Sequence, residues 1–161
     1  MASGPFSLAK APPIRADALG GGATVALVEW KPSYSVGVPV FDRQHARLFE
    51  LMNQLHEAMS KGQAKEQLGR IVDALSTYTK IHFAEEELAL QRANYKDLAA
   101  HKILPRKFEA KVDGFGNEIK QGTVGLSIQV MDFLNDWLVN HIMKIDRDYQ
   151  PLLAQSQAAV Q

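Results

Sequence analysis

The chain has 161 residues, of which 46% are hydrophobic and 22% charged, and its formal net charge is +0 at pH 7. This size and composition are typical of one globular domain with a single core. The neutral balance gives no global field that favours nucleic acid or an anionic membrane, and no apolar run approaches the roughly 20 residues that span a bilayer. Because cysteine is absent, disulfides and thiolate metal sites are excluded, and any metal must bind nitrogen and oxygen ligands.

Residues 1–28 predict a flexible tail rather than a second domain, because they are rich in glycine, alanine and proline and show no sustained period. They lack the charged and then apolar organisation of a secretory signal, so we expect a cytoplasmic protein. An apolar stretch follows from Trp30 to Phe41. Pro32 and Pro39 oppose helix in this stretch, which predicts an extended N-terminal arm that packs across the core.

Four helices are predicted after the arm, because apolar side chains recur there at alternating intervals of three and four residues. Their connections are short, which favours neighbours that run in opposite directions. The predicted fold class is therefore all-α, an up-down-up-down antiparallel four-helix bundle with an N-terminal extended arm. The expected helices cover about 42–61, about 64–92, about 97–119, and a stretch that begins after Thr123.

The predicted bundle occupies residues 29–153, and residues 154–161 are expected to form a C-terminal tail. Gly62 is a stop signal for the first helix, and Asp97 is a suitable N-cap for the third. Gly114 and Gly116 are expected to weaken the distal half of the third helix, because glycine is a poor helix former.

Six side chains of metal-binding type fall on the inward faces of the four predicted helices. Imidazole and carboxylate groups are costly inside a bundle unless they are paired or bound to a cation. His82 and Glu86 are four residues apart, so both project from one face of a helix. In an antiparallel bundle the others can converge at the same level. The predicted metal ligands are His45, His82, Glu86, His101, His141 and Asp146.

The spacing of the last pair requires a local change of helix geometry. Asp146 follows His141 by five residues, and a regular helix would turn it about 140° away. Both can reach one centre only if the helix ends or loosens between them, as a π-type turn would allow. Two carboxylates with several imidazoles suit a pair of iron or manganese ions better than one structural zinc.

Each of these residues also has an ordinary structural interpretation. A lone His45 is typical of a core or boundary histidine, and His82 with Glu86 is typical of a helical charge pair. His141 and Asp146 could be polar residues at a helix end. Their joint occurrence on four inward faces favours a metal centre, and a metal-free structural bundle remains the alternative.

The combined pattern resembles the hemerythrin family, especially its bacterial domains, over about residues 29–153. The resemblance implies a four-helix bundle with two non-heme irons, bridged by Glu86, Asp146 and an oxo- or hydroxo-type ligand. It also implies that His45 and His82 serve the iron that takes dioxygen, while His101 and His141 serve the second iron. The matching segments are Asp42-Arg-Gln-His45, His82-Phe-Ala-Glu-Glu86-Glu87, Tyr95 with His101-Lys102, and Trp137-Leu-Val-Asn-His141-Ile-Met-Lys-Ile-Asp146.

The sequence departs from the family pattern one turn after His101, where a histidine is expected and Pro105 stands. Proline has no metal-binding side chain, so the second iron would lose one imidazole and keep open positions. Proline also removes the backbone bond to the carbonyl of His101, which predicts a kink there. Glu109, a turn further on, could supply a carboxylate in its place.

The leading functional prediction is a non-heme di-iron protein that binds dioxygen or a related small anion or ligand, for storage, transport or sensing. The alternative is an oxidase- or peroxidase-type enzyme that uses the open positions left by Pro105. No nucleic-acid or membrane partner is expected, and sensing would need a separate output protein. The candidate walls of the ligand pocket are Leu48, Phe49, Met52, Phe83, Leu90 and Trp137.

Overall fold

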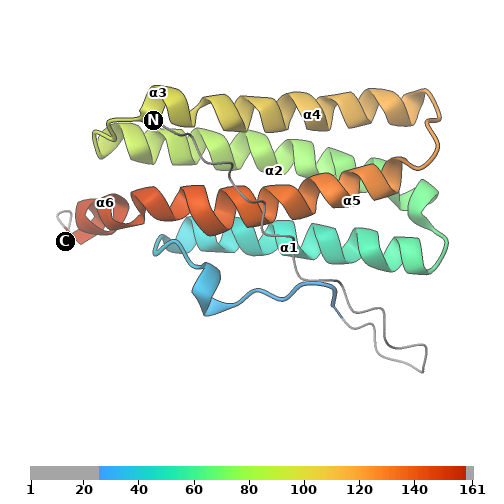
Figure 1. Cartoon of the computed structure of the whole chain (residues 1–161), viewed down its shortest axis with the longest axis horizontal. Coiled ribbons are helices and arrows are strands. Elements are labelled where there is room, and N and C mark those ends of the chain that lie inside the picture. The colour runs from blue at the N-terminus through green and yellow to red at the C-terminus, as the bar shows by residue number, and fades with distance from the viewer. Residues whose placement is uncertain (1–25, 159–161) are drawn as a thin grey trace, which may run out of the picture.

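The structure, a computed structural model, describes residues 26–158 and consists of helices without strands in that part of the chain. The helices form four long rods that lie side by side (Figure 1), which confirms the predicted all-α four-helix bundle. Two of the rods are interrupted: one is made of α3 and α4, the other of α5, the π-helical segment η2 and α6. The elements are η1 (Pro32–Tyr34), α1 (Pro39–Ser60), α2 (Ala64–Arg92), α3 (Leu98–His101), α4 (Ile103–Lys120), α5 (Leu126–Trp137), η2 (Leu138–Ile145) and α6 (Asp146–Ala158).

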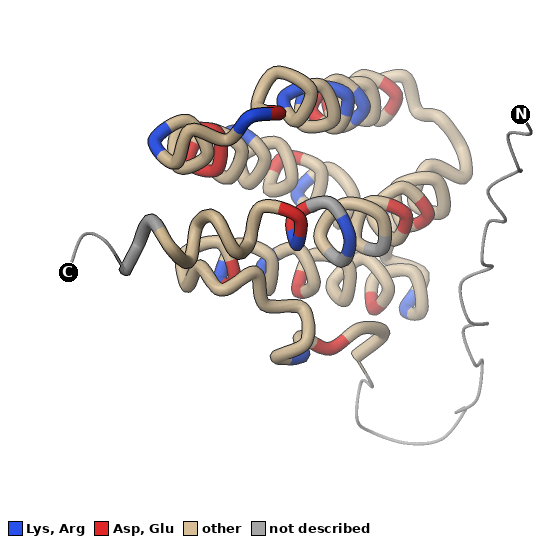
Figure 2. Tube along the Cα trace, turned by 60° about the vertical axis from the view of Figure 1, so that its left-hand side comes forward, with Lys and Arg blue, Asp and Glu red and all other residues tan. Residues whose placement is uncertain are grey.

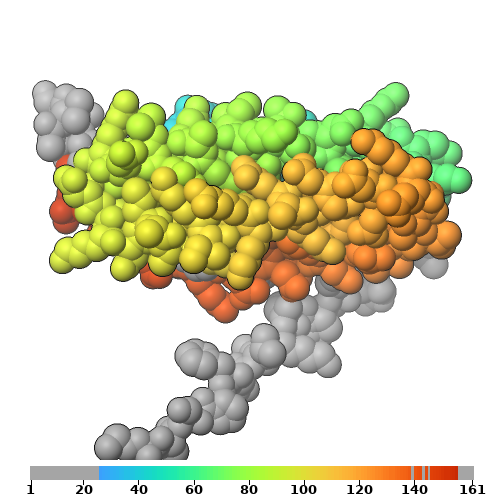
Figure 3. Space-filling model, turned by 90° about the horizontal axis from the view of Figure 1, so that it is seen from above, coloured from blue at the N-terminus to red at the C-terminus, as the bar shows by residue number. Residues whose placement is uncertain are grey.

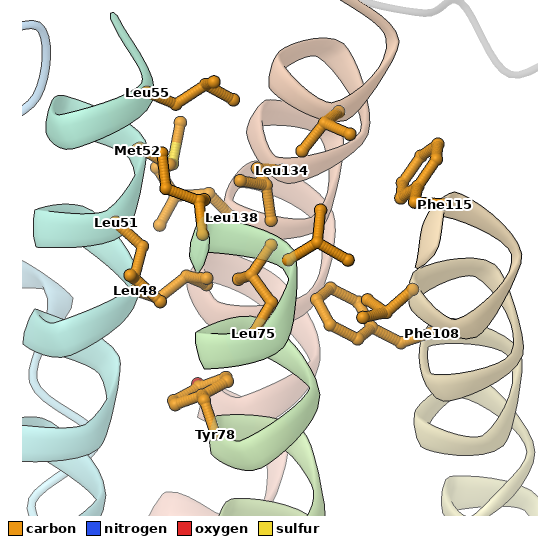
Figure 4. Close-up of a cluster of buried hydrophobic side chains, with 14 of the residues drawn as sticks. Leu48, Leu51, Met52, Leu55, Leu75, Tyr78, Phe108, Phe115, Leu134 and Leu138 are labelled. Atoms are coloured by element: carbon orange, nitrogen blue, oxygen red, sulfur yellow. The ribbon is translucent and has the colours of Figure 1, made fainter. Parts of the chain in front are cut away.

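The inward faces of the rods meet in one large apolar cluster, with side chains from all four rods (Figure 4). Leu48, Met52 and Leu55 from α1 and Leu75 from α2 are fully buried in it. Burial of each such side chain stabilises the fold by about 1.5–3 kcal/mol. Basic and acidic residues are mixed along the outer faces (Figure 2), as expected for a chain without net charge.

The arm before α1 is held by hydrogen bonds that involve side chains. The backbone N–H of Val28 donates to the Asn53 side chain at 3.0 Å, and the Asn53 amide donates back to the Val28 carbonyl at 2.8 Å. Further along, Ser35 donates to a carboxylate oxygen of Asp42 at 2.5 Å, and Arg147 of α6 donates to the Ser33 carbonyl. The arm therefore lies along α1 (Figure 1) and is also attached to α6.

The start of the first helix differs from the prediction, whereas the end of the third agrees with it. Pro39 was expected to oppose helix, but it stands in the first turn of α1, where a missing N–H costs nothing and the fixed φ suits helix. α4 continues through Gly114 and Gly116 to Lys120, because the bundle supplies packing that outweighs propensity. α6 continues to Ala158, so the first residues of the expected C-terminal tail are helical.

The third rod is interrupted as Pro105 predicts. α3 ends at His101, and α4 starts at Ile103. Pro105 cannot donate to the carbonyl of His101, and the next backbone bond, from Arg106 N–H to the Lys102 carbonyl, is long at 3.5 Å. α2 and α4 lie side by side on the face shown in Figure 3, so the break lies within a packed rod.

Among the helices that the structure describes, none has a stretch both long and apolar enough to cross a membrane.

Candidate metal centre

The six predicted ligands come together in the interior of the bundle. α1 supplies His45, α2 supplies the His82–Glu86 pair, and α3, η2 and α6 supply the remaining three. Every one of the six is between 0% and 5% exposed. The helices bury polar groups here that would be costly without partners, which separates this level of the bundle from the apolar cluster.

Each of the two carboxylates lies between two imidazoles. Asp146 places Oδ2 at 3.2 Å from Nε2 of His45 and Oδ1 at 3.0 Å from Nε2 of His141. Glu86 places Oε2 at 2.9 Å from Nε2 of His101 and Oε1 at 3.9 Å from Nε2 of His82. The four imidazoles therefore form two pairs, one on each side of the carboxylates. His45 and His82 lie on one side, and His101 and His141 lie on the other.

Two groups of side chains in the described part of the chain could each hold an ion, because the ligand atoms within each group lie within 4.8 Å of one another. Asp146 belongs to both groups. One group is completed by His45 and His82, the other by Glu86 and His141. A carboxylate shared by two groups is an arrangement for two neighbouring cations.

Asp146 reaches the centre because of the π-helical segment. η2 covers Leu138–Ile145 and contains His141. The backbone N–H of Asp146 donates to the carbonyl of His141, which is the five-residue bond of a π-helix. This winding brings residues five apart onto one face and confirms the predicted loosening between the two side chains.

The donors fit a cation, since their buried atoms lack hydrogen-bond partners. Both ring nitrogens of His45 and His141 and both carboxylate oxygens of Asp146 are in this state. The ion-pair contacts between them are close but are not aligned as hydrogen bonds. Each unsatisfied buried group costs about 1–3 kcal/mol. Metal ligation through one ring nitrogen of each histidine and through the Asp146 carboxylate would remove part of this cost.

The electrostatic environment differs between the two sides of the centre. Burial lowers the pKa of His82 to about 4 despite the nearby Glu86, so its ring is neutral and able to ligate at neutral pH. Burial also acts on His101, but the hydrogen bond and the charge of Glu86 outweigh it and raise the pKa of His101. Asp146 is buried too, yet His141 and His45 hold its pKa below the usual value. It is therefore an anion.

Gln44 is a functional residue that the sequence interpretation missed. Its Nε2 donates to Glu85 at 2.5 Å, so its Oε1 faces His82 Nδ1 at 2.8 Å and can only accept. Nδ1 of His82 must then carry the proton, which leaves Nε2 free for a metal. Gln44 directly precedes His45 in the segment Asp42-Arg-Gln-His45, and this position could have identified it from the sequence.

Tyr149 was missed as well. It is fully buried, and its hydroxyl donates to Oε1 of Glu86. Its ring lies 5.5 Å from the ring of His101 between centroids. It follows Asp146 by three residues on α6, and that helical spacing could have identified it.

Pro105 is buried in α4 and offers no donor atom. Glu109 is half-buried and belongs to neither of the two candidate ion-binding groups of the described residues.

The predicted pocket walls divide between two apolar clusters. Trp137 stacks on the His141 ring at 4.0 Å and packs against the large cluster. That cluster also contains Leu48, Phe49, Met52 and Phe83. Leu90 lies instead in the second cluster with Tyr149.

The fold and these buried donors define a helical-bundle protein of the histidine–carboxylate metal class. A family model described as the Hemerythrin HHE cation binding domain matches residues 36–153. The chain belongs to the hemerythrin family.

Known proteins similar to this chain agree. It is 34% identical to a bacteriohemerythrin of Methylococcus capsulatus over 131 residues, which are 81% of this chain and 99% of that protein. It is 30% identical to Myohemerythrin-1 of Phascolopsis gouldii over 122 residues, 75% of this chain and 90% of that one. The crystal structure of a wild-type hemerythrin matches with a TM-score of 0.72 and 33% identity, covering 80% of this chain and 99% of that chain.

Proposed function

We propose that the chain is a non-heme di-iron protein that binds dioxygen or a related small ligand reversibly. The observation that carries the proposal is Asp146, which lies between His45 and His141 and is shared by the two ion-binding groups. Family membership supplies the identity of the metal. The proposed iron ligands are His45, His82, Glu86, His101, His141 and Asp146.

The chain's own side chains have separable roles in this proposal. Iron, when bound, supplies a centre that takes up the small ligand and exchanges electrons with it. Glu86 and Asp146 hold their negative charge between the imidazoles, so two cations can lie close together. Gln44 fixes the tautomer of His82. Buried apolar walls such as Leu48 and Phe83 exclude water from the ligand.

The proposal is tested by elemental analysis together with ultraviolet–visible spectra with and without azide. We expect two irons per chain and an azide-dependent charge-transfer band. The Glu86→Ala, Asp146→Ala double variant should lose most of its iron and fall in thermal stability relative to the loaded protein, because both shared carboxylates are gone. Asp132→Ala, which removes an exposed carboxylate on α5, is the matched control. Full iron loading of the double variant would sink the assignment.

A second candidate function is peroxide or dioxygen activation, and the buried Pro105 favours it. A side chain without a donor at this position leaves the iron of His101 and His141 with fewer protein ligands. Open positions let substrate and oxidant meet at a metal. Steady peroxide turnover by the loaded protein, with rapid autoxidation of its dioxygen complex, would favour the enzyme over the carrier.

A further inference from the structure

Tyr78 is placed beside the metal centre, although its spacing alone suggests a core residue. It lies one helical turn before His82 on α2, and its ring stacks on the His82 ring at 5.2 Å with an angle of 10° between planes. The residue is 8% exposed. Figure 4 shows it at the end of the apolar cluster, next to Leu48 and Leu75.

The hydroxyl of Tyr78 is buried and has no hydrogen-bond partner. The other buried side-chain atoms in this state, within the described residues, all belong to His45, His141 and Asp146. Those three are proposed metal ligands, so a metal would supply partners for the Asp146 carboxylate and for one ring nitrogen of each histidine. Among these four residues only Tyr78 is not a proposed metal ligand, and it contrasts with Tyr149, whose hydroxyl donates to Glu86.

The Tyr78 ring lies on the His45–His82 side of the centre, because it stacks on the His82 ring. The rings of His45 and His82 lie 4.8 Å apart, and Asp146 Oδ2 is the carboxylate oxygen on that side. A phenol hydroxyl carries its proton at neutral pH and can donate a hydrogen bond.

Outside solvent does not supply the missing partner. A surface hollow of about 450 Å³ between α1 and α2 is lined by Tyr78 together with Gln44 and Ile81. The ring forms part of the wall of this hollow, but the hydroxyl oxygen itself is buried. A buried donor without an acceptor is costly, so a partner that arrives with the filled centre would remove that cost.

We propose that the Tyr78 hydroxyl donates a hydrogen bond to the small anionic or dioxygen-derived ligand that binds beside His45 and His82. This inference rests on the proposed function and adds a ligand-binding residue to it. Hydrogen bonds to charged acceptors are stronger than neutral ones, so Tyr78 would favour ligands that carry negative charge.

The test is azide titration of the iron-loaded protein, followed through the charge-transfer band, with Tyr78→Phe beside wild type. Phenylalanine keeps the stacked ring and removes only the hydroxyl. We expect azide to bind about tenfold more weakly to Tyr78→Phe, the size of effect for one hydrogen bond to a charged group, with iron content unchanged. Tyr34→Phe is the matched control, since Tyr34 is half-buried on the arm and its ring contacts Trp30 and Phe49. It should bind azide as wild type does.

A second measurement separates ligand binding from a structural role. In the metal-free protein Tyr78→Phe removes an unpaired buried hydroxyl, so its melting temperature should not fall. Azide affinity within twofold of wild type, or loss of iron from a folded Tyr78→Phe variant, would overturn the inference while the di-iron assignment stands. Absence of iron or of azide binding in wild type would overturn the proposed function, and this inference with it.

Discussion

Pro105→His restores both a backbone donor and a candidate ligand at the break between α3 and α4. An interior proline costs a helix about 3 kcal/mol. The structure shows that cost as an interruption after His101 and a 3.5 Å bond from Arg106 N–H to the Lys102 carbonyl. A histidine at position 105 could donate its N–H to the His101 carbonyl, and α3 and α4 should then join.

The size of the effect depends on whether iron is present. In the metal-free protein a buried imidazole without partners costs about 1–3 kcal/mol, which largely offsets the helix gain, so stability should change little. In the loaded protein the new imidazole is satisfied by metal, and the gain is retained. A net difference of about 1.4 kcal/mol corresponds to tenfold tighter retention. We therefore expect at least tenfold slower iron loss to a chelator.

The assays are chelator-driven iron release, autoxidation of the dioxygen complex and peroxide turnover, with wild type beside Pro105→Ala and Pro105→His. Pro105→Ala returns the backbone donor without a ligand, so it isolates the helix contribution. We expect slower autoxidation and lower peroxide activity for Pro105→His alone. If Pro105→His left release, autoxidation and metal content unchanged, the argument for an open iron would be refuted.

The other predictions concern pH and the N-terminal tail. Iron retention should weaken as the pH falls through the pKa of His101, which Glu86 raises above its usual value, because a proton then competes with the metal. Chelator competition across pH checks this, and a flat profile would contradict it. In the metal-free protein His101 stabilises the fold below pH 6.5 and loses that contribution as the pH rises through its raised pKa. His82 does the reverse, and its contribution is lost as the pH falls from 6.5 towards about 4. Thermal unfolding against pH separates the two. Deleting residues 1–25, which lie outside the described residues, should leave helix content and iron unchanged; a large fall in melting temperature would show that they dock.

Periodicity and ligand spacing were sufficient to predict the bundle and the residues that meet inside it. The three-and-four alternation predicts which faces turn inward, and the five-residue interval from His141 to Asp146 predicts the π-helical segment. The break at Lys102 follows from the missing N–H of Pro105. These features depend on local backbone geometry, and the number of residues between two side chains determines whether they share a helix face.

Contacts between distant segments could not be predicted in the same way. Gln44 orients His82 across 38 residues of chain, and Tyr149 reaches Glu86 across 63. Neither interval carries a period. Pro39 shows a second cause of error, since proline is tolerated in the first turn of a helix and excluded from its interior. Its effect depends on where the helix starts, which was the unknown quantity.

The π-helical segment η2 also separates what keeps the bundle folded from what makes it useful. A π-bulge accommodates one residue more than the α-helix around it, so α5 and α6 could pack on the same neighbours with a shorter connection. Leu138 and Ile142 of η2 pack in the apolar cluster, and Asp146 depends on the extra residue to face His141. Selection for thermal stability alone would favour its deletion, and selection for the centre would oppose it. Deletion of one residue within η2 should therefore readily give variants that are thermally more stable but bind no metal. Such a deletion would leave all six ligand side chains in the sequence.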